Sequence, residues 1–489
     1  MNPEAATWLC RGALAAIALF VPALAPAYPI DGYEHTGIGR LEAVRRIEAG
    51  EMQGRKQPAG ATLPTEAVDI RLTGHADIGL PEVDAGFSRQ IVALLGEYAD
   101  RYGISVLDMT DPDELRYAEH HGGVTRNPGS VGKILVAMAI WQALADLYPD
   151  DTARRWQLLK DTEIVADEFI ISDSHTVRRW DRESETLIRR PLQVGDRGSM
   201  MEYMDWMLSA SSNAAAATLM KQAVLLKHFG TGFPVDTATA DAFLKDTPRS
   251  ELRALLAETM HEPITRNGLD IERLRQGSLF TRTGKARIPG TNSYGTSREL
   301  MKLVMRMEQG RIVDEFSSRE LKRLLYITER RIRYASSPAL RDAAVYFKSG
   351  SLYQCVPEPD FKCKKYHGNK KNYMNSVAIV ETPAEKGGLH YAVTLMSNVL
   401  RRNSAVDHQT LATRIHRLIE KYHAEKAAAA QKAREAEAAR EAEAARASEA
   451  APEAGETGDG GQVQEAPEAG SSDQAPAESA GAAAGSTEG

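Results

Sequence analysis

The segment Ser130-Val-Gly-Lys-Ile-Leu-Val-Ala-Met-Ala-Ile-Trp-Gln-Ala-Leu-Ala-Asp-Leu147 decides the fold, because after its first four residues it is almost entirely apolar. Its length suits a buried helix, and Pro149 just beyond it is a typical stop signal. Two β-prone runs precede it, at residues 104–109 and 115–118, and an Asp-Pro-Asp turn separates them. The sequence therefore predicts a central helix that follows a pair of strands.

Segments on either side of this core predict the rest of the domain. Apolar residues from Phe87 to Tyr98 repeat at helical spacing, so a helix is expected over residues 87–102. Helical patterns dominate from residue 134 to about 325; strand-like runs follow at 344–354, 373–381 and 389–400, then a helix at 406–422. This order predicts an α/β (α+β) fold: an antiparallel sheet of about five strands, flanked by N- and C-terminal helices, with an inserted all-α lobe.

The N-terminus has the pattern of an export signal. Residues 12–27 form an uncharged run of 16 residues that closes with Ala25-Pro-Ala27, a small-x-small pattern. The run is shorter than the roughly 20 residues of a bilayer span. We expect a signal peptide over residues 1–27, cleaved near Ala27, an extracytoplasmic (periplasmic or secreted) location and no stable membrane span afterwards. An uncleaved anchor is the alternative, because Glu4 offsets Arg11.

Cysteine spacing fits the same compartment. Cys355 and Cys363 would close a loop of nine residues, and a disulfide there would contribute about 2.5 kcal/mol by loop-closure entropy. Two independent thiols are the alternative. The chain has no CxxC, HExxH or Cys/His cluster, so no metal site is predicted.

Charge is distributed unevenly along the chain. The net charge is −7 over 489 residues, and residues 424–489 hold 14 acidic against 5 basic side chains, which leaves the rest close to neutral. This balance gives no reason to expect a nucleic-acid partner. An Ala/Glu/Arg-rich helix and then a disordered acidic tail are expected in 424–489, with contact to an unknown protein as an open role. Residues 28–85 form an N-terminal extension of unknown role.

Ser130 and Lys133 form the first candidate site motif. Their i, i+3 spacing at a helix start puts both side chains on one face. A serine becomes a nucleophile when a nearby amine takes its hydroxyl proton. The alternative is an ordinary serine near a helix N-terminus with a surface lysine.

Two further motifs follow in the chain. Ser211-Ser-Asn213 lies in a break between helices, where a plain capping turn is the alternative. Lys348-Ser-Gly350 lies inside a strand-like run, and a glycine there indicates close approach of a ligand or, alternatively, a bulge or edge position. Base rates give roughly 0.05 chance occurrences of the three motifs in this order.

In this order the motifs resemble the penicillin-recognising serine hydrolase superfamily, meaning serine β-lactamases and D,D-peptidases, and the single-sheet layout looks most like a class A β-lactamase domain. The resemblance implies a catalytic domain over residues 86–423 and no cofactor. It implies that Ser130 is acylated by an amide carbonyl and that Lys133 is its base or proton relay. It also implies that Ser211 passes a proton to the leaving nitrogen.

The same resemblance implies the substrate contacts. Asn213 would hold the acyl side chain, Lys348, Ser349 and Gly350 would bind the substrate carboxylate, and the backbone amides of Ser130 and Ser351 would form the oxyanion hole. The implied ligand is a small-molecule β-lactam or a cell-wall peptide.

One departure concerns deacylation. Class A β-lactamases activate water with a glutamate between the second and third motifs, but alignment on Ile288-Pro289 puts Thr281-Arg-Thr-Gly-Lys285 there, without a carboxylate. The segment from Glu262 to Asn267 imitates the motif with one residue too many, and Asp270 or Glu272 could serve after a loop shift. Acylation is expected, and efficient β-lactam turnover is not.

These observations predict an exported acyl-serine hydrolase that cleaves an amide next to a carboxylate, in a β-lactam or a D-Ala-D-Ala peptide. Two alternatives stay open. One is a catalytically inactive peptidoglycan-binding or scaffold module, which would have no need of Lys133. The other is an SxxK esterase, in which a tyrosine is common at the position of Ser211.

Overall fold

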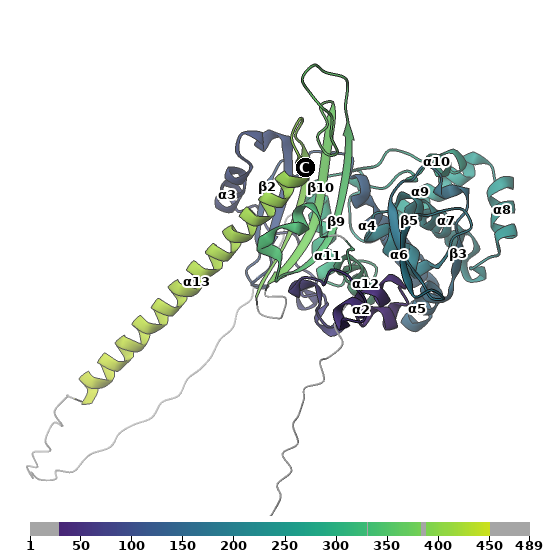
Figure 1. Ribbon diagram of the computed structural model, residues 1–489. Coiled ribbons are helices and arrows are strands. Elements are labelled where there is room, and N and C mark those ends of the chain that lie inside the picture. The colour runs from purple at the N-terminus through teal and green to yellow at the C-terminus, as the bar shows by residue number, and fades with distance from the viewer. Residues whose placement is uncertain (1–28, 330, 383–387, 450–489) are drawn as a thin grey trace, which may run out of the picture. The chain divides into compact units, whose positions relative to one another are not determined.

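The computed structural model describes residues 29–329, 331–382 and 388–449 (Figure 1). The expected signal peptide and the acidic tail beyond residue 449 lie outside these residues. The chain forms two units, Met1–Ala424 and Glu425–Gly489. The last helix is α13 (Ser404–Glu449).

A five-stranded sheet organises the first unit. Its strands are β1 (Tyr102–Asp108), β2 (Arg116–His120), β9 (Ala344–Gln354), β10 (Lys371–Thr382) and β11 (Leu389–Asn398). They lie in the order β2-β1-β11-β10-β9, with every neighbouring pair antiparallel. The predicted fold class and the predicted five-stranded antiparallel sheet are confirmed.

Both faces of this sheet are covered. On one face, Ile91 of α3 (Ala85–Leu95) and Ile415 of α13 share a core with Val106 and Val393. On the other face, α4 (Lys133–Leu147), α11 (Ser297–Glu308) and α12 (Glu315–Tyr326) share a second core with Leu107 and Ile379. Every residue of β1 is buried, as expected for an inner strand of a sheet that is covered on both faces.

Helix α4 is the central element of the second core. Gly129–Leu147 is long and apolar enough to cross a membrane, but 83% of its most apolar window is buried inside the protein. Helix α4 is hydrophobic all round because other elements surround it, as expected for a core helix.

The inserted lobe is mostly helical. Its helices are α5 (Thr152–Asp161), α6 (Met200–Leu208), α7 (Asn213–Phe229), α8 (Thr237–Asp246), α9 (Arg249–Arg266) and α10 (Arg282–Arg287). It also contains three two-stranded sheets: β3 (Glu163–Val165) with β6 (Arg197–Ser199), β4 (Thr176–Asp181) with β5 (Thr186–Pro191), and β7 (Leu274–Arg275) with β8 (Tyr294–Gly295). The sequence predicts no strands in this lobe.

The N-terminal extension packs onto this domain. Arg40, at the start of α2 (Arg40–Ala49), donates two hydrogen bonds of 2.6 Å to the carboxylate of Asp205 in α6. Both side chains are almost fully buried. A short helix, α1 (Gly32–Thr36), precedes α2. Breaking a buried ion pair of this kind costs several kcal/mol, so the extension contributes to the stability of the domain.

Candidate active site

Ser130 lies in a 3₁₀ turn, Gly129–Gly132, that leads into α4. Gly129 has φ +54°, and its amide donates to Asn127 Oδ1 at 2.8 Å, which shapes the turn. Lys133 is the first residue of α4 and is fully buried. Its Nζ lies 3.0 Å from Ser130 Oγ. The i, i+3 spacing therefore brings the amine and the hydroxyl into hydrogen-bonding contact, as the sequence predicts.

The loop between α6 and α7 brings the second motif to the same amine. Lys133 Nζ donates to Ser211 O at 2.7 Å and to Asn213 Oδ1 at 2.8 Å. Ser211 has φ +61°, a left-handed conformation that turns the chain sharply before α7. Ser212 then caps α7 by accepting a hydrogen bond from Ala215 N.

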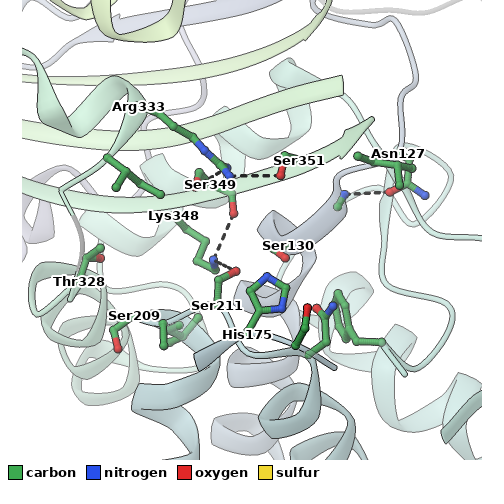
Figure 2. Close-up of a pocket in the computed structure, with 18 of the residues that line it drawn as sticks. Asn127, Ser130, His175, Ser209, Ser211, Thr328, Arg333, Lys348, Ser349 and Ser351 are labelled. Carbon is green, nitrogen blue, oxygen red and sulfur yellow. Dashed lines mark hydrogen bonds between the residues drawn. The ribbon is translucent and has the colours of Figure 1, made fainter. Parts of the chain in front are cut away.

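Strand β9 supplies the third motif (Figure 2). Lys348 Nζ donates to Ser211 Oγ at 2.8 Å, so one hydroxyl links the second and third motifs. A Cβ on Gly350 would lie 2.4 Å from Pro128 O and 2.8 Å from Ser130 N. Glycine is therefore required here because the backbone of the Ser130 turn approaches β9.

Burial sets the charge state of both lysines. Burial lowers the pKa of Lys133 to about 7, and the charge of Asp173 opposes this shift. Burial, together with the charges of Lys133 and Arg333, places the pKa of Lys348 well below its ordinary value. At neutral pH a substantial fraction of Lys133 is therefore the neutral amine that can accept a proton.

Arg333 is a site residue that the sequence analysis missed. It donates to Ser349 Oγ at 2.8 Å, to Ser351 Oγ at 3.2 Å and to Tyr366 OH at 2.9 Å (Figure 2). Its guanidinium thus lies beside the Lys348-Ser-Gly350 motif and adds positive charge there. Arg333 begins a short 3₁₀ turn, Arg333–Ser336, ahead of β9, and no motif in the sequence marks it.

Asp173 and His175 are two more residues that the sequence analysis missed. Asp173 Oδ2 accepts hydrogen bonds from Ser212 Oγ and Ala214 N, both at 2.9 Å. The other oxygen, Oδ1, lies 2.6 Å from His175 Nδ1. Burial acts to raise the pKa of Asp173. The pKa is nevertheless well below its usual range, because the carboxylate accepts hydrogen bonds from His175 and from backbone amides and lies beside the charge of His175. The carboxylate therefore ties His175 to the second motif.

These residues surround a cleft of about 670 Å³. Five basic side chains line it, Arg189, Lys285, Arg333, Lys348 and Lys365, and among them the lowered pKa of Lys348 favours its neutral form. No Asp or Glu is among the described residues of the lining. The cleft is therefore suited to an anionic ligand.

The region of the class A glutamate also has no carboxylate at the cleft. Thr281 caps α10, and Lys285 and Gln276 line the cleft instead. Glu262 pairs with Lys227 at 2.6 Å, and Glu272 accepts a hydrogen bond from Tyr294 OH at 3.1 Å. Neither these two residues nor Asp270 belongs to the lining.

Cys355 and Cys363 form a disulfide in the connection between β9 and β10. The loop that it closes precedes Lys365 and Tyr366, which line the cleft. The disulfide thus constrains the chain that leads to the Tyr366 contact with Arg333.

Several known proteins are similar to this chain. Among solved structures the chain is similar to a PBP-A mutant in its acyl-enzyme complex with penicillin G, at 14% identity over 70% of this chain and 100% of that chain, with a TM-score of 0.44. It is also similar to a β-lactamase from Chitinophaga pinensis, at 15% identity over 69% and 98%, with a TM-score of 0.43. No curated protein sequence matches. The family model described as the β-lactamase enzyme family matches residues 86–422, and the chain therefore belongs to this family of penicillin-recognising serine hydrolases.

Proposed function

We propose that the chain is an exported serine hydrolase that cleaves an amide next to a carboxylate through an acyl-enzyme on Ser130. The observation that carries the proposal is the 3.0 Å contact between Ser130 Oγ and a buried Lys133 amine whose pKa is lowered to about 7. Such an amine can take the serine proton near neutral pH, as general-base catalysis requires. A pure binding module would have no use for this pair.

Acylation begins with attack of Ser130 Oγ on the amide carbonyl while Lys133 Nζ accepts the hydroxyl proton. The developing oxyanion needs donors, and we assign this role to the backbone amides of Ser130 and Ser351. Their proximity is supported by the 2.8 Å between the Cβ site of Gly350 and Ser130 N. Each donor of this kind is commonly worth about 3 kcal/mol.

Expulsion of the leaving nitrogen needs a proton donor. We assign this role to Ser211 Oγ, which lies 3.5 Å from Lys133 Nζ and 2.8 Å from Lys348 Nζ. A proton taken by Lys133 can pass through this hydroxyl to the amine product. Asn213, whose Oδ1 accepts from Lys133, is left with its amide N–H groups to hold the acyl side chain.

The substrate carboxylate is assigned to Lys348, Ser349, Gly350 and Arg333. Charge-assisted hydrogen bonds from a guanidinium to a carboxylate are strong and fix its orientation. The lack of described acidic side chains in the lining supports this assignment. The substrate class is a β-lactam or a D-Ala-D-Ala cell-wall peptide, since both place a carboxylate beside the scissile amide.

We further propose the domain organisation and location. Residues 1–27 are a signal peptide, 28–85 an extension, 86–423 the catalytic domain and 424–489 a tail. The Cys355–Cys363 disulfide supports an oxidising, extracytoplasmic location.

The test is the intact mass of the protein after mixing with penicillin G, followed from seconds to hours. We expect a penicilloyl adduct that is absent in Ser130→Ala and present in Ser174→Ala, a matched serine variant in the same cleft. Release of D-Ala from a D-Ala-D-Ala peptide then distinguishes a peptidase from a lactamase. No adduct and no hydrolysis of either compound would contradict the proposal and favour the non-catalytic module or the esterase.

A further inference from the structure

Hydrolysis of an acyl-enzyme needs a second base, and His175 is placed to provide one. This step rests on the proposed function, since it begins from the Ser130 ester. Among the described lining residues His175 is the one histidine, and none is a carboxylate. His175, Ser130 and Ser211 all line the cleft, and in the view of Figure 2 the His175 ring is drawn close to both serines.

The orientation of the His175 ring follows from Asp173. An ionised carboxylate accepts hydrogen bonds only, so the nitrogen 2.6 Å from Asp173 Oδ1, which is Nδ1, carries the hydrogen. In the neutral imidazole the lone pair is then on Nε2. None of the residues that the structure describes bonds to Nε2, and the side chain is 40% exposed. The basic nitrogen is therefore open to water in the cleft.

Asp173 holds this ring in a defined place relative to the reacting serine. The backbone amide of His175 also donates to Asp173 Oδ1, at 3.2 Å. The other oxygen is bound by Ser212 Oγ and Ala214 N. Ser212 lies between Ser211 and Asn213, both of which contact Lys133. The carboxylate, the imidazole and the Ser130–Lys133 pair therefore form one connected arrangement.

We propose that His175 is the general base that clears the Ser130 acyl-enzyme, with Asp173 as its positioning residue. His175 Nε2 accepts a proton from a water molecule as the water oxygen bonds to the ester carbon. The tetrahedral intermediate then collapses, the bond from carbon to Ser130 Oγ breaks, and the imidazolium returns its proton to Oγ. The products are a carboxylic acid and the free serine, so atoms and charges balance.

The test separates acylation from deacylation with penicillin G as the probe. Two variants remove the base: His175→Gln and His175→Phe, the second of which keeps an aromatic ring. His121→Gln is the matched control, because His121 is exposed and lies outside the cleft lining. Acylation is followed by intact mass under excess drug, and deacylation after removal of the drug. Thermal unfolding confirms that each variant is folded.

We expect acylation rates within about threefold of wild type and deacylation at least about 100-fold slower in both His175 variants, with no change in the control. Hydroxylamine attacks esters without needing a base, so the part of the clearance rate that depends on added hydroxylamine should be the same in wild type and variants. Asp173→Asn should slow deacylation more than acylation, which a purely structural role would not do.

Other outcomes overturn the inference in distinguishable ways. Wild-type deacylation rates in both His175 variants would assign the base elsewhere. If the wild-type adduct persisted for hours, acylation of Ser130 would be supported, but there would be no hydrolytic step for His175 to catalyse. Failure of wild type to form any adduct or product would reject the proposed function itself, and the inference with it.

Discussion

Lys133 combines two properties that ordinarily exclude each other: it is fully buried and it carries a titratable amine. Burial of an amine disfavours the charged form, and here it brings the pKa to about 7. The folded state therefore binds fewer protons than the unfolded chain between pH 7 and the ordinary value of 10.5, so this residue makes the protein more stable as pH rises through that window. Its cost in stability at lower pH follows from the burial of a charged amine.

The rate of acylation should follow the titration of this amine. Only neutral Lys133 can accept the Ser130 proton, so the second-order acylation rate constant for penicillin G should rise with pH and level off above about pH 7. In Lys133→Ala the acylation rate constant should fall by at least about 100-fold, while the thermal transition stays nearly unchanged. The rate constant that remains should no longer rise with pH. A wild-type rate that is flat from about pH 5.5 to about pH 8.5, roughly 1.5 units on either side of that pKa, would place the base elsewhere.

Arg333 should act on binding of the substrate carboxylate. Its guanidinium contacts Ser349 and Ser351 and adds positive charge at the third motif. In Arg333→Ala, acylation by penicillin G should fall by about 10- to 100-fold, as expected for loss of a charge-assisted hydrogen bond of 1.5–3 kcal/mol. The methyl ester of penicillin G lacks the carboxylate, so its slower acylation should hardly change. An equal loss with both compounds would indicate a structural role instead.

Of the residues around the cleft, those in local motifs were predictable and those that depend on tertiary contacts were not. Ser130 and Lys133 lie one helical turn apart, so their contact follows from spacing alone. Asp173, His175 and Arg333 lie far in sequence from Ser130, and single Asp, His and Arg residues give no pattern. Their places depend on the loop before β4 and the turn before β9, which only the folded chain defines.

At the scale of elements, strands with a local sequence pattern were predictable and strands without one were not. The five strands of the main sheet were predictable because turns bound β-prone runs, which are long in β9, β10 and β11 and short in β1 and β2. Strands β4 and β5 were not, since they include Arg178, Arg179, Arg189 and Arg190. A hairpin with this composition shows no alternation of apolar and polar residues.

The packing of β9 against the Ser130 turn is the element contact on which the site depends. In Gly350→Ala the added methyl group would meet Pro128 O at 2.4 Å, so the strand and the turn must move apart. We expect a loss of about 1–3 kcal/mol in the free energy of unfolding from overpacking and about a 100-fold loss in acylation from the displaced oxyanion donors.

A matched glycine controls for the substitution itself. Gly79 is exposed and has nothing within 4 Å of its Cβ position, so Gly79→Ala should leave both quantities unchanged. Urea unfolding and intact mass with penicillin G measure the two effects. Normal acylation in Gly350→Ala would show that the contact between strand and turn does not hold the donors in place.

At the scale of the whole molecule, a buried ion cluster joins the sheet, the helices and the N-terminal extension. Lys322 of α12 lies 2.7 Å from Glu308 of α11 and 2.6 Å from Glu381 of β10. The extension completes the cluster: Lys322 donates to Asp69 O at 2.6 Å, and Arg71 N donates to Glu308 at 2.9 Å. The extension therefore belongs to the folded unit, although the sequence assigned it no role.

Protonation of this cluster should destabilise the protein in acid. Burial acts to raise the pKa of Glu308, but the charges of Lys322 and His390 overcome it and lower the pKa. The pKa of Glu381 is lowered in the same way. Carboxyl groups with lowered pKa values stabilise the fold above their unfolded pKa of about 4.3, and this contribution is lost as pH falls below it.

Removal of the central cation tests whether the cluster holds the three parts together. Lys322→Ala leaves two carboxylates buried without their lysine, and loss of one partner from a buried pair costs about 3–5 kcal/mol. Urea unfolding at pH 7 should show this loss. The matched control is Lys302→Ala, because Lys302 on α11 also pairs with a glutamate, at 3.1 Å, but is 40% exposed; its effect should stay within about 1 kcal/mol. If both variants lost equally little free energy of unfolding, neighbouring groups such as Arg71 would be balancing the two carboxylate charges without Lys322. The attachment of the extension would then depend on the Arg40–Asp205 pair.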